Sequence, residues 1–254
     1  MIVLVDIGNS RIKWARFDGR ALTSSRAAVH RTWRARDYAR LFTGRPERLL
    51  VTSVAGKGVE KALRAAARRA RMRVTFVNVP RRAAGVTVGY RDPWRLGVDR
   101  FVALVGAHQL FPGVPLLIAG LGTAMTLDLI DAKGRHQGGA IIPGPRLMVE
   151  TLLKDTNGIR RRAQGGRLNA ATLFGRSTRD GIERGARFAA AALIERASAD
   201  AAVLLKRSPL VVLTGGAASA VRPLITGHVV SVPDLVLKGL AVLATEARAP
   251  RGGR

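Results

Sequence analysis

Residue types that can bind phosphate stand close together near the N-terminus. The sequence DIGNS (6–10) follows an apolar run, and Lys13 comes three residues after it. Gly8 permits a tight turn whose backbone N–H groups can approach a phosphate, and the two polar side chains after it can donate further hydrogen bonds. Lys13 adds a positive charge, and Asp6 could hold Mg²⁺ directly or through water. A hairpin turn without a ligand would use the same residues, and the spacing matches neither a P-loop nor GxGxxG.

Two later glycine turns offer similar chemistry. The segment GTAMT (122–126) supplies backbone donors and two hydroxyl groups, and TGG (214–216) joins an expected strand to an expected helix. The first turn could clamp a triphosphate together with the N-terminal turn, and the second could lie against the adenosine part of a nucleotide. Close packing of a strand on a helix would explain the second equally well. Three glycine turns after three expected strands are more specific than any one of them.

A carboxylate and a guanidinium meet at an expected helix start, in YRDPWRLGVDR (90–100). Asp99 could accept the proton of a substrate hydroxyl as that oxygen attacks phosphorus. Arg100 could hold an anionic group of the substrate. An Asp in a first helical turn also interacts favourably with the helix dipole without any catalytic role. From these two residues alone, the structural interpretation is favoured.

Two further segments have both a functional and a structural interpretation. The glycine-rich GGAIIPGP (138–145) could let a ligand approach the backbone, or could serve a tight bend of a sheet. Thr178 could donate a hydrogen bond to a substrate carboxylate, or could cap the long helix that follows. The four His residues show no ligand spacing, so the sequence predicts no metal bound by histidine.

Composition narrows the class of protein. The 254 residues include 47% hydrophobic residues, so the chain can bury a sizeable core. The absence of cysteine excludes disulfides, thiolate zinc sites and cysteine nucleophiles. No apolar run is long enough to span a membrane. The N-terminus opens on the strand-like IVLVD rather than on a signal peptide, which makes the cytoplasm the expected compartment.

The net charge of +26 arises from 43 Lys and Arg against 17 Asp and Glu. The basic residues are scattered, and the aromatic content of 5% provides few platforms on which bases could stack. The sequence therefore disfavours nucleic acid as the main partner, while the charge suits an anionic small ligand such as a nucleotide. An Arg-rich proteome would explain the surplus without any partner.

Alternating strand and helix patterns must position these residues. We expect strands at 1–6, 11–17, 48–54, 74–79, 116–119, 126–130, 138–142, 210–213 and 229–232, and helices at 57–72, 97–111, 147–154, 170–206 and 234–247. The segment IVLVDIGNSRIKWARFDGR is repeated in pattern by LLIAGLGTAMTLDLIDAKGR, 114 residues later. This duplication predicts an α/β protein of two related domains, 1–112 and 113–254, that face a cleft.

The motifs in this order resemble the type III pantothenate kinases of the acetate and sugar kinase/actin-like superfamily. The resemblance spans nearly the whole chain. It rests on DIGNSRIK (6–13), YRDPWRLGVDR (90–100), GTAMTLD (122–128), GGAIIPG (138–144), GRST (175–178), LTGGAA (213–218) and PDLVLKGL (233–240).

The resemblance implies two actin-like (ribonuclease H-like) domains and the ATP-dependent phosphorylation of pantothenate to 4'-phosphopantothenate, the first step of coenzyme A biosynthesis. It makes Asp99 the catalytic base that receives the proton of the pantothenate hydroxyl. It assigns ATP binding to Asp6, Ile7, Gly8, Asn9, Ser10, Arg11, Ile12, Lys13, Gly122 and Thr123. It assigns pantothenate binding to Tyr90, Gly97, Val98, Asp99, Arg100 and Thr178, with Thr178 contributed across a homodimer interface. Mg²⁺ is implied with ATP, and a monovalent cation, K⁺ or NH₄⁺, is implied beside it.

One position departs from the family pattern. The family usually has an Asp two residues before the GTA motif, where it is implicated in cation binding, and this chain has Gly120. The missing carboxylate weakens the expectation of a potassium site. The family also includes a branch of Bvg accessory factors, linked to gene regulation. A regulatory protein with the same fold and little or no kinase activity is therefore the first alternative hypothesis. Another kinase or phosphatase of the same superfamily, with a different acceptor, is the second.

Overall fold

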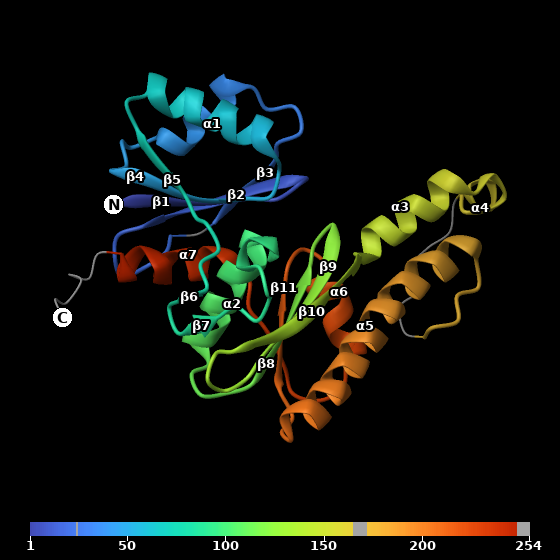
Figure 1. The fold of residues 1–254 in the computed structure, drawn as a ribbon. Helices are drawn as coiled ribbons and strands as arrows, with labels where there is room; N and C mark the ends of the chain where they lie inside the picture. The colour runs from blue at the N-terminus through green and yellow to red at the C-terminus, as the bar shows by residue number, and fades with distance from the viewer. Residues whose placement is uncertain (24, 165–171, 248–254) are drawn as a thin grey trace. The chain divides into compact units, whose positions relative to one another are not determined.

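The computed structural model describes residues 1–23, 25–164 and 172–247, which form two compact α/β units (Figure 1). Unit 1 comprises Met1–Gly113, Lys133–His136 and the segment that begins at Asp234, and unit 2 comprises Val114–Ala132 and Gln137–Pro233. None of the helices in the described ranges is both long enough and apolar enough to span a membrane.

Unit 1 is built on a five-stranded sheet with strand order β3-β2-β1-β4-β5. β1 pairs antiparallel with β2 and parallel with β4. The strands are β1 (Ile2–Ile7), β2 (Arg11–Phe17), β3 (Arg26–Val29), β4 (Arg48–Ser53) and β5 (Arg73–Phe76). Side chains alternate between the two faces of a strand, so Val3, Val5 and Ile7 pack in one core with Tyr38 and Leu63. These last two residues belong to the 3₁₀ helix η1 (Ala35–Phe42) and to α1 (Lys57–Arg69).

The opposite face of this sheet is covered by α2 (Val98–Leu110) and α7 (Leu235–Glu246) (Figure 1). The two helices approach closely because each has a glycine at the contact. A Cβ added to Gly239 would lie 1.9 Å from the backbone oxygen of Val102, and one added to Gly106 would lie 2.7 Å from that of Leu235. A short hairpin of β6 (Arg82–Ala83) and β7 (Val86–Thr87) and the 3₁₀ turn η2 (Pro93–Arg95) precede α2.

Unit 2 repeats the sheet of unit 1, with order β10-β9-β8-β11-β12. Its strands are β8 (Leu116–Leu121), β9 (Ala124–Ile130), β10 (His136–Pro143), β11 (Leu210–Thr214) and β12 (Val229–Ser231). Its helices are α3 (Pro145–Asp155), α4 (Asn157–Arg162), α5 (Thr178–Leu205), α6 (Ala218–Val221) and the 3₁₀ turn η3 (Arg222–Leu224). Side chains of α5 and α6 share one core with β8, β9 and β11. The matching strand orders confirm the duplication predicted from the sequence.

The predicted domain limits need one correction. The boundary predicted after residue 112 lies beside the observed one, but residues from Asp234 onward do not stay with the second half of the chain. They return to unit 1, because the apolar face of α7 packs on α2 and β1. A hydrophobic helix at the end of a chain carries no local signal of which sheet it will cover.

Most predicted elements are confirmed to within a few residues. Among the elements that the sequence missed are β3, η1, α4 and the hairpin of β6 and β7, and none of them shows a long apolar pattern. The helix predicted at 170–206 begins only at Thr178, and residues 165–171 lie outside the described part of the chain.

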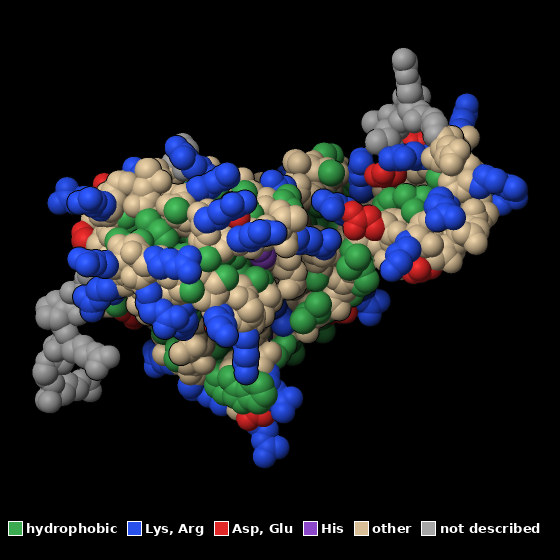
Figure 2. Space-filling model, turned by 90° about the horizontal axis from the view of Figure 1, so that it is seen from above, with side chains coloured by type: hydrophobic (Ala, Val, Ile, Leu, Met, Phe, Trp, Pro, Cys, Tyr) green, Lys and Arg blue, Asp and Glu red, His purple; other side chains and the backbone are tan. Residues whose placement is uncertain are grey.

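Basic side chains are spread over the surface. On the face shown in Figure 2, Lys and Arg are distributed widely, with few Asp or Glu between them. Helix α1 alone exposes Lys57, Lys61, Arg64 and Arg68 at helical spacing. On the face shown the basic side chains are dispersed, in keeping with their scattered positions in the sequence.

Candidate active site

Three polar residues form a row across the sheet of unit 1. Asp6, near the end of β1, is the Cα partner of Lys13 on β2 and of Thr52 on β4. Residues directly opposite on paired strands have side chains on the same face. Thr52 Oγ1 donates a hydrogen bond to Asp6 Oδ1 over 3.0 Å. The row therefore places a carboxylate between an ammonium group and a hydroxyl on the face that carries α2 and α7.

The Asp6 carboxyl is held in an unfavourable environment for a negative charge. Desolvation raises its pKa from 3.8 to about 6, and the nearby carboxylate of Asp99 adds to the increase. The hydrogen bond from Thr52 and the charge of Lys13 oppose the shift without cancelling it. A carboxylate that costs stability in this way is well suited to bind a cation that arrives with a ligand.

This shift predicts how the stability of the protein without nucleotide depends on pH. Because the folded-state pKa of Asp6 is raised, its ionisation costs stability, and the cost develops between about pH 4 and 6. A shift of about two units corresponds to about 3 kcal/mol. Asp6→Asn removes this cost, so the variant should be more stable than the parent at pH 8 and lose that advantage at pH 4. Thermal unfolding at both pH values measures the difference.

Asp18→Asn is the matched control for this experiment. Backbone hydrogen bonds from Ala21 and Arg20 lower the pKa of the exposed Asp18. Its replacement should therefore show the opposite trend with pH, with the stability deficit appearing at neutral pH rather than in acid. Equal pH trends for Asp6→Asn and the parent would contradict the assignment of the raised pKa.

The predicted base lies in the first turn of α2. Asp99 Oδ1 accepts a hydrogen bond from the backbone N–H of Arg100 over 2.8 Å. A Cβ on Gly97 would lie 2.7 Å from the same Asp99 oxygen, which explains the glycine before the helix. The carboxylate is only partly buried, and it is close enough to Asp6 to affect the pKa of that residue.

Arg100 and Tyr90 form one cluster beside Asp99. Arg100 is buried, and its Nη1 donates to the Tyr90 hydroxyl over 3.3 Å. The Tyr90 ring lies 5.5 Å from the ring of buried His136, between centroids. Arg81 supports this segment by donating to the backbone oxygens of Tyr90 and Arg91, each over 2.6 Å. The cluster has the composition of a pocket for a polar, anionic substrate.

The first glycine turn is a compact hairpin between β1 and β2. The backbone N–H of Gly8 donates to Arg11 O over 3.0 Å. His30, which is buried, donates from Nε2 to Gly8 O over 2.6 Å, and its backbone N–H donates to Ser10 O over 3.4 Å. His30 thus braces the turn from outside it, a role that the sequence analysis did not identify.

Lys13 has a partner far along the chain. Its Nζ lies 2.9 Å from Asp234 Oδ1, and Ser25 Oγ donates to Asp234 Oδ2 over 2.5 Å. Burial alone would raise the pKa of Asp234, but these hydrogen bonds and the Lys13 charge outweigh it and hold the pKa below its usual value. The sequence analysis missed Asp234 and Ser25, although the former lies in the PDLVLKGL segment.

Unit 2 carries the second turn, with Gly122 and Thr123 between β8 and β9. The backbone N–H of Gly144 donates to Thr123 O over 2.9 Å, and a Cβ on Gly144 would lie 2.2 Å from Gly122 O. Gly215, with φ of +96°, approaches Leu121 so closely that a Cβ would lie 2.5 Å from its backbone oxygen. The segments that contain Gly122, Gly144 and Gly215 therefore lie together at the end of β8, where their backbone groups could contact a ligand.

Thr178 is the first residue of α5. The N-cap is Ser177, whose Oγ accepts from the backbone N–H of Asp180 over 3.1 Å. Ser177 therefore caps the helix, and the interpretation of Thr178 as the helix cap is wrong. Arg184, which contacts Asp180, also donates to Thr172 O over 2.7 Å and so ties the preceding loop to the helix.

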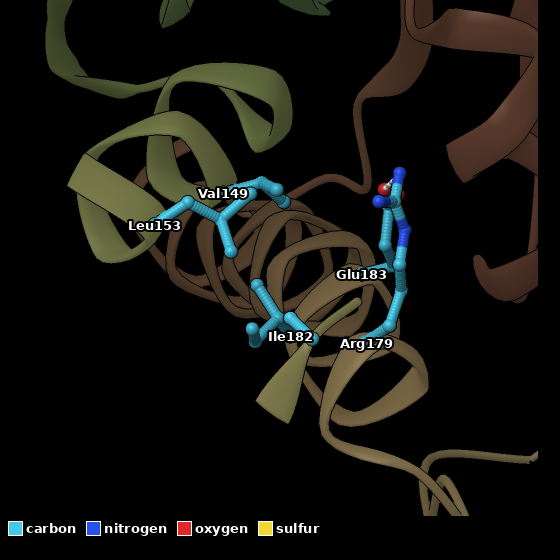
Figure 3. A pocket seen from close by; sticks show the side chains of 6 residues that line it. Val149, Leu153, Arg179, Ile182 and Glu183 are labelled. Atoms are coloured by element: carbon cyan, nitrogen blue, oxygen red, sulfur yellow. Dashed lines mark ion pairs between the residues drawn. The ribbon is translucent and has the colours of Figure 1, made fainter. Parts of the chain in front are cut away.

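A recess between α3 and α5 is not part of this site. It is lined by Val149, Leu153, Ala163, Arg179, Ile182 and Glu183, and Figure 3 shows the Arg179–Glu183 ion pair at its side. The recess has no enclosed volume that would fit a water molecule, and we assign no ligand to it.

The position of Gly120 does not suit a carboxylate without local change. Gly120 pairs with Thr126, and a Cβ there would lie 2.8 Å from Thr126 Oγ1. Within the described ranges, no three His, Cys, Asp or Glu side chains gather as a metal site. The residues present do not fit a monovalent cation bound through a carboxylate at this position.

The fold is that of two related actin-like α/β domains, as the sequence predicted. A kinase assigned as a 2-dehydro-3-deoxygalactonokinase, from Sinorhizobium meliloti, superposes with a TM-score of 0.60 at 14% identity, over 98% of this chain and 100% of its own. A protein assigned to the Baf family of transcriptional activators, from Campylobacter jejuni, superposes with a TM-score of 0.58 at 17% identity, over 96% and 98%. At these identities the likeness establishes the fold alone.

Comparison of sequences identifies the family, which the comparison of folds does not. Residues 2–200 match the family described as type III pantothenate kinase. A type III pantothenate kinase from Azoarcus sp. (strain BH72) is 37% identical over 246 residues, which cover 96% of this chain and 90% of the relative. The chain belongs to the type III pantothenate kinase family.

Proposed function

We propose that this protein transfers the terminal phosphoryl group of ATP to pantothenate, giving 4'-phosphopantothenate, the first step of coenzyme A biosynthesis. Family membership over most of the chain supports the activity. The observation that carries the proposal is the grouping in unit 1 of Asp6, Lys13 and Asp99. Asp6 supplies a carboxylate that can bind a cation, Lys13 an ammonium group, and Asp99 a carboxylate that can act as a base.

The proposed chemistry assigns each group one task. Asp99 accepts the proton of the primary hydroxyl of pantothenate as that oxygen attacks the γ-phosphorus. The ATP-binding set consists of the first turn from Asp6 to Lys13 together with Gly122 and Thr123. These residues hold phosphate oxygens through backbone N–H groups, hydroxyls and the Lys13 ammonium. Mg²⁺ bound with ATP would be held by Asp6 and would neutralise phosphate charge.

Pantothenate offers hydroxyls, an amide and a carboxylate, and the proposed pocket has matching groups. The Arg100 guanidinium, fixed by Tyr90, supplies a cation for the substrate carboxylate. Gly97 and Val98 bring the backbone at the start of α2 next to Asp99. Thr178 adds a hydroxyl that the helix cap does not use.

We also propose that the protein works as a homodimer in the cytoplasm, as the family resemblance implies. Apolar side chains near Thr178 are exposed, among them Phe174 at 84% and Leu173 at 44%. Leu152 on α3 is exposed at 41%. Covering such residues on a second copy would remove apolar area from water.

The direct test is ADP release by the purified protein with ATP, Mg²⁺ and pantothenate, in potassium and in tetramethylammonium buffers. We expect pantothenate-dependent turnover, at similar rates in the two buffers because Gly120 supplies no carboxylate for the cation. Strong dependence on potassium would contradict the interpretation of Gly120. Absence of turnover in both buffers, with ATP binding intact, would contradict the kinase proposal and favour the regulatory alternative.

A further inference from the structure

Asp234 is placed as a helix N-cap but does not act as one. It immediately precedes α7, where an Asp side chain normally accepts a hydrogen bond from the first turn. No such bond is formed by its side chain. Both carboxylate oxygens instead face β2 and the segment after it, with Oδ1 on Lys13 Nζ at 2.9 Å and Oδ2 on Ser25 Oγ at 2.5 Å.

The backbone at Asp234 is unusual in the same place. Its φ of +55° lies in the left-handed region, which Asp tolerates better than most residues. This is also the point at which the chain passes from unit 2 back to unit 1. The left-handed backbone and the unmade cap together leave the Asp234 side chain directed at Lys13 and Ser25 instead of at its own helix.

Two carboxylates, those of Asp6 and Asp234, are close to Lys13, and each would orient its side chain in a different direction. Asp6 is its direct Cα partner on β1, while Asp234 approaches from the start of α7. An ammonium group has three donors, and Asp234 occupies one of them. Pairing with Asp234 therefore restrains a flexible side chain, leaves two donors for phosphate oxygens, and holds the Lys13 ammonium group on Asp234 rather than on Asp6.

We propose that Asp234 is a positioning residue for phosphoryl transfer: it orients Lys13 toward the phosphates of the nucleotide and keeps Asp6 available. The inference rests on the proposed function, because it assumes that Lys13 contacts nucleotide phosphate. It also gives the return of the C-terminal segment to unit 1 a role in the site, since that return brings Asp234 to Lys13.

A double-mutant cycle tests the proposal. Asp234→Asn keeps the shape of the side chain and removes its charge, and Lys13→Gln removes the group on which it acts. We expect Asp234→Asn to raise the KM for ATP about tenfold, with the KM for pantothenate little changed. In the Lys13→Gln background the same substitution should have almost no further effect on ATP. Asp234→Glu, which keeps the charge, should restore part of the affinity.

Glu246→Gln is the matched control. Glu246 lies at the other end of α7, where it accepts a hydrogen bond from the backbone N–H of Ala84 over 3.2 Å. This substitution perturbs the packing of the same helix without approaching Lys13. It should therefore leave the KM for ATP unchanged, whatever it does to the melting temperature.

Several outcomes would overturn the inference. One is an equal effect of Asp234→Asn with and without Lys13, and another is a lowered melting temperature with unchanged ATP kinetics. Calorimetric titration of the same variants with Mg²⁺–ATP separates this inference from the proposed function. If the parent protein binds ATP but does not turn over, the kinase proposal fails, and the cycle measured on binding still decides the role of Asp234. A parent protein that binds no ATP would refute both.

Discussion

Replacing Asp99 with Asn is expected to lower turnover at least about tenfold, because an amide cannot accept the proton of the attacking hydroxyl. ATP binding should stay nearly intact. The amide oxygen can still accept the hydrogen bond that Arg100 N–H now gives to Asp99, so the first turn of α2 should keep its conformation. The fall should therefore appear in kcat rather than in the dissociation constant for ATP.

Steady-state kinetics and calorimetric binding of ATP to the same preparations would measure both quantities. Asp92→Asn is a suitable control, since Asp92 lies seven residues earlier and forms an ion pair with Arg95 in its own loop. It should retain turnover close to that of the parent. Near-normal turnover in Asp99→Asn would refute the assignment of this carboxylate as the base.

The second large effect is expected on stability, from Gly239→Ala. The new methyl group would lie 1.9 Å from the backbone oxygen of Val102, a distance that no Cβ can keep, so α7 and α2 must separate. Alanine is the better helix former by about 1 kcal/mol, but the clash involves backbone and outweighs this gain. We expect a net loss of about 3 kcal/mol.

Such a loss should lower the melting temperature by roughly 6–12 °C for a protein of this size. Gly58→Ala provides the comparison, because Gly58 lies on α1 and a Cβ there meets no atom within 4 Å. That variant should melt at or slightly above the temperature of the parent. A melting temperature for Gly239→Ala equal to that of Gly58→Ala would show that the two helices can part without cost.

Local sequence patterns were sufficient to predict the structure where a buried strand is followed by a glycine turn. The apolar runs at β1 and β8 predicted both hairpins, and their similarity predicted the two matching sheets. Patterns failed at β3, an edge strand with little burial, and at η1, whose buried side chains are only Tyr38 and Leu41. Elements that bury few side chains carry little periodic signal.

In the candidate site, too, some features could be predicted from local sequence and others could not. The types and spacing of Asp6, Lys13 and Asp99 made them candidates, because short turns and helix starts are encoded by neighbouring residues. Phosphoryl transfer was suggested only by the order of all the motifs along the chain and the family that they resemble. The raised pKa of Asp6 could not be foreseen, since it depends on desolvation and on a carboxylate from another element.

The class of fold, the duplication and the chemistry of the phosphate turn thus follow from residues that are close together in the chain. The partner of Lys13 and the destination of α7 depend on contacts across 221 positions. Those contacts form only when the glycines of α2 and α7 let the two helices close on each other, which is a property of packing in three dimensions rather than of any local pattern.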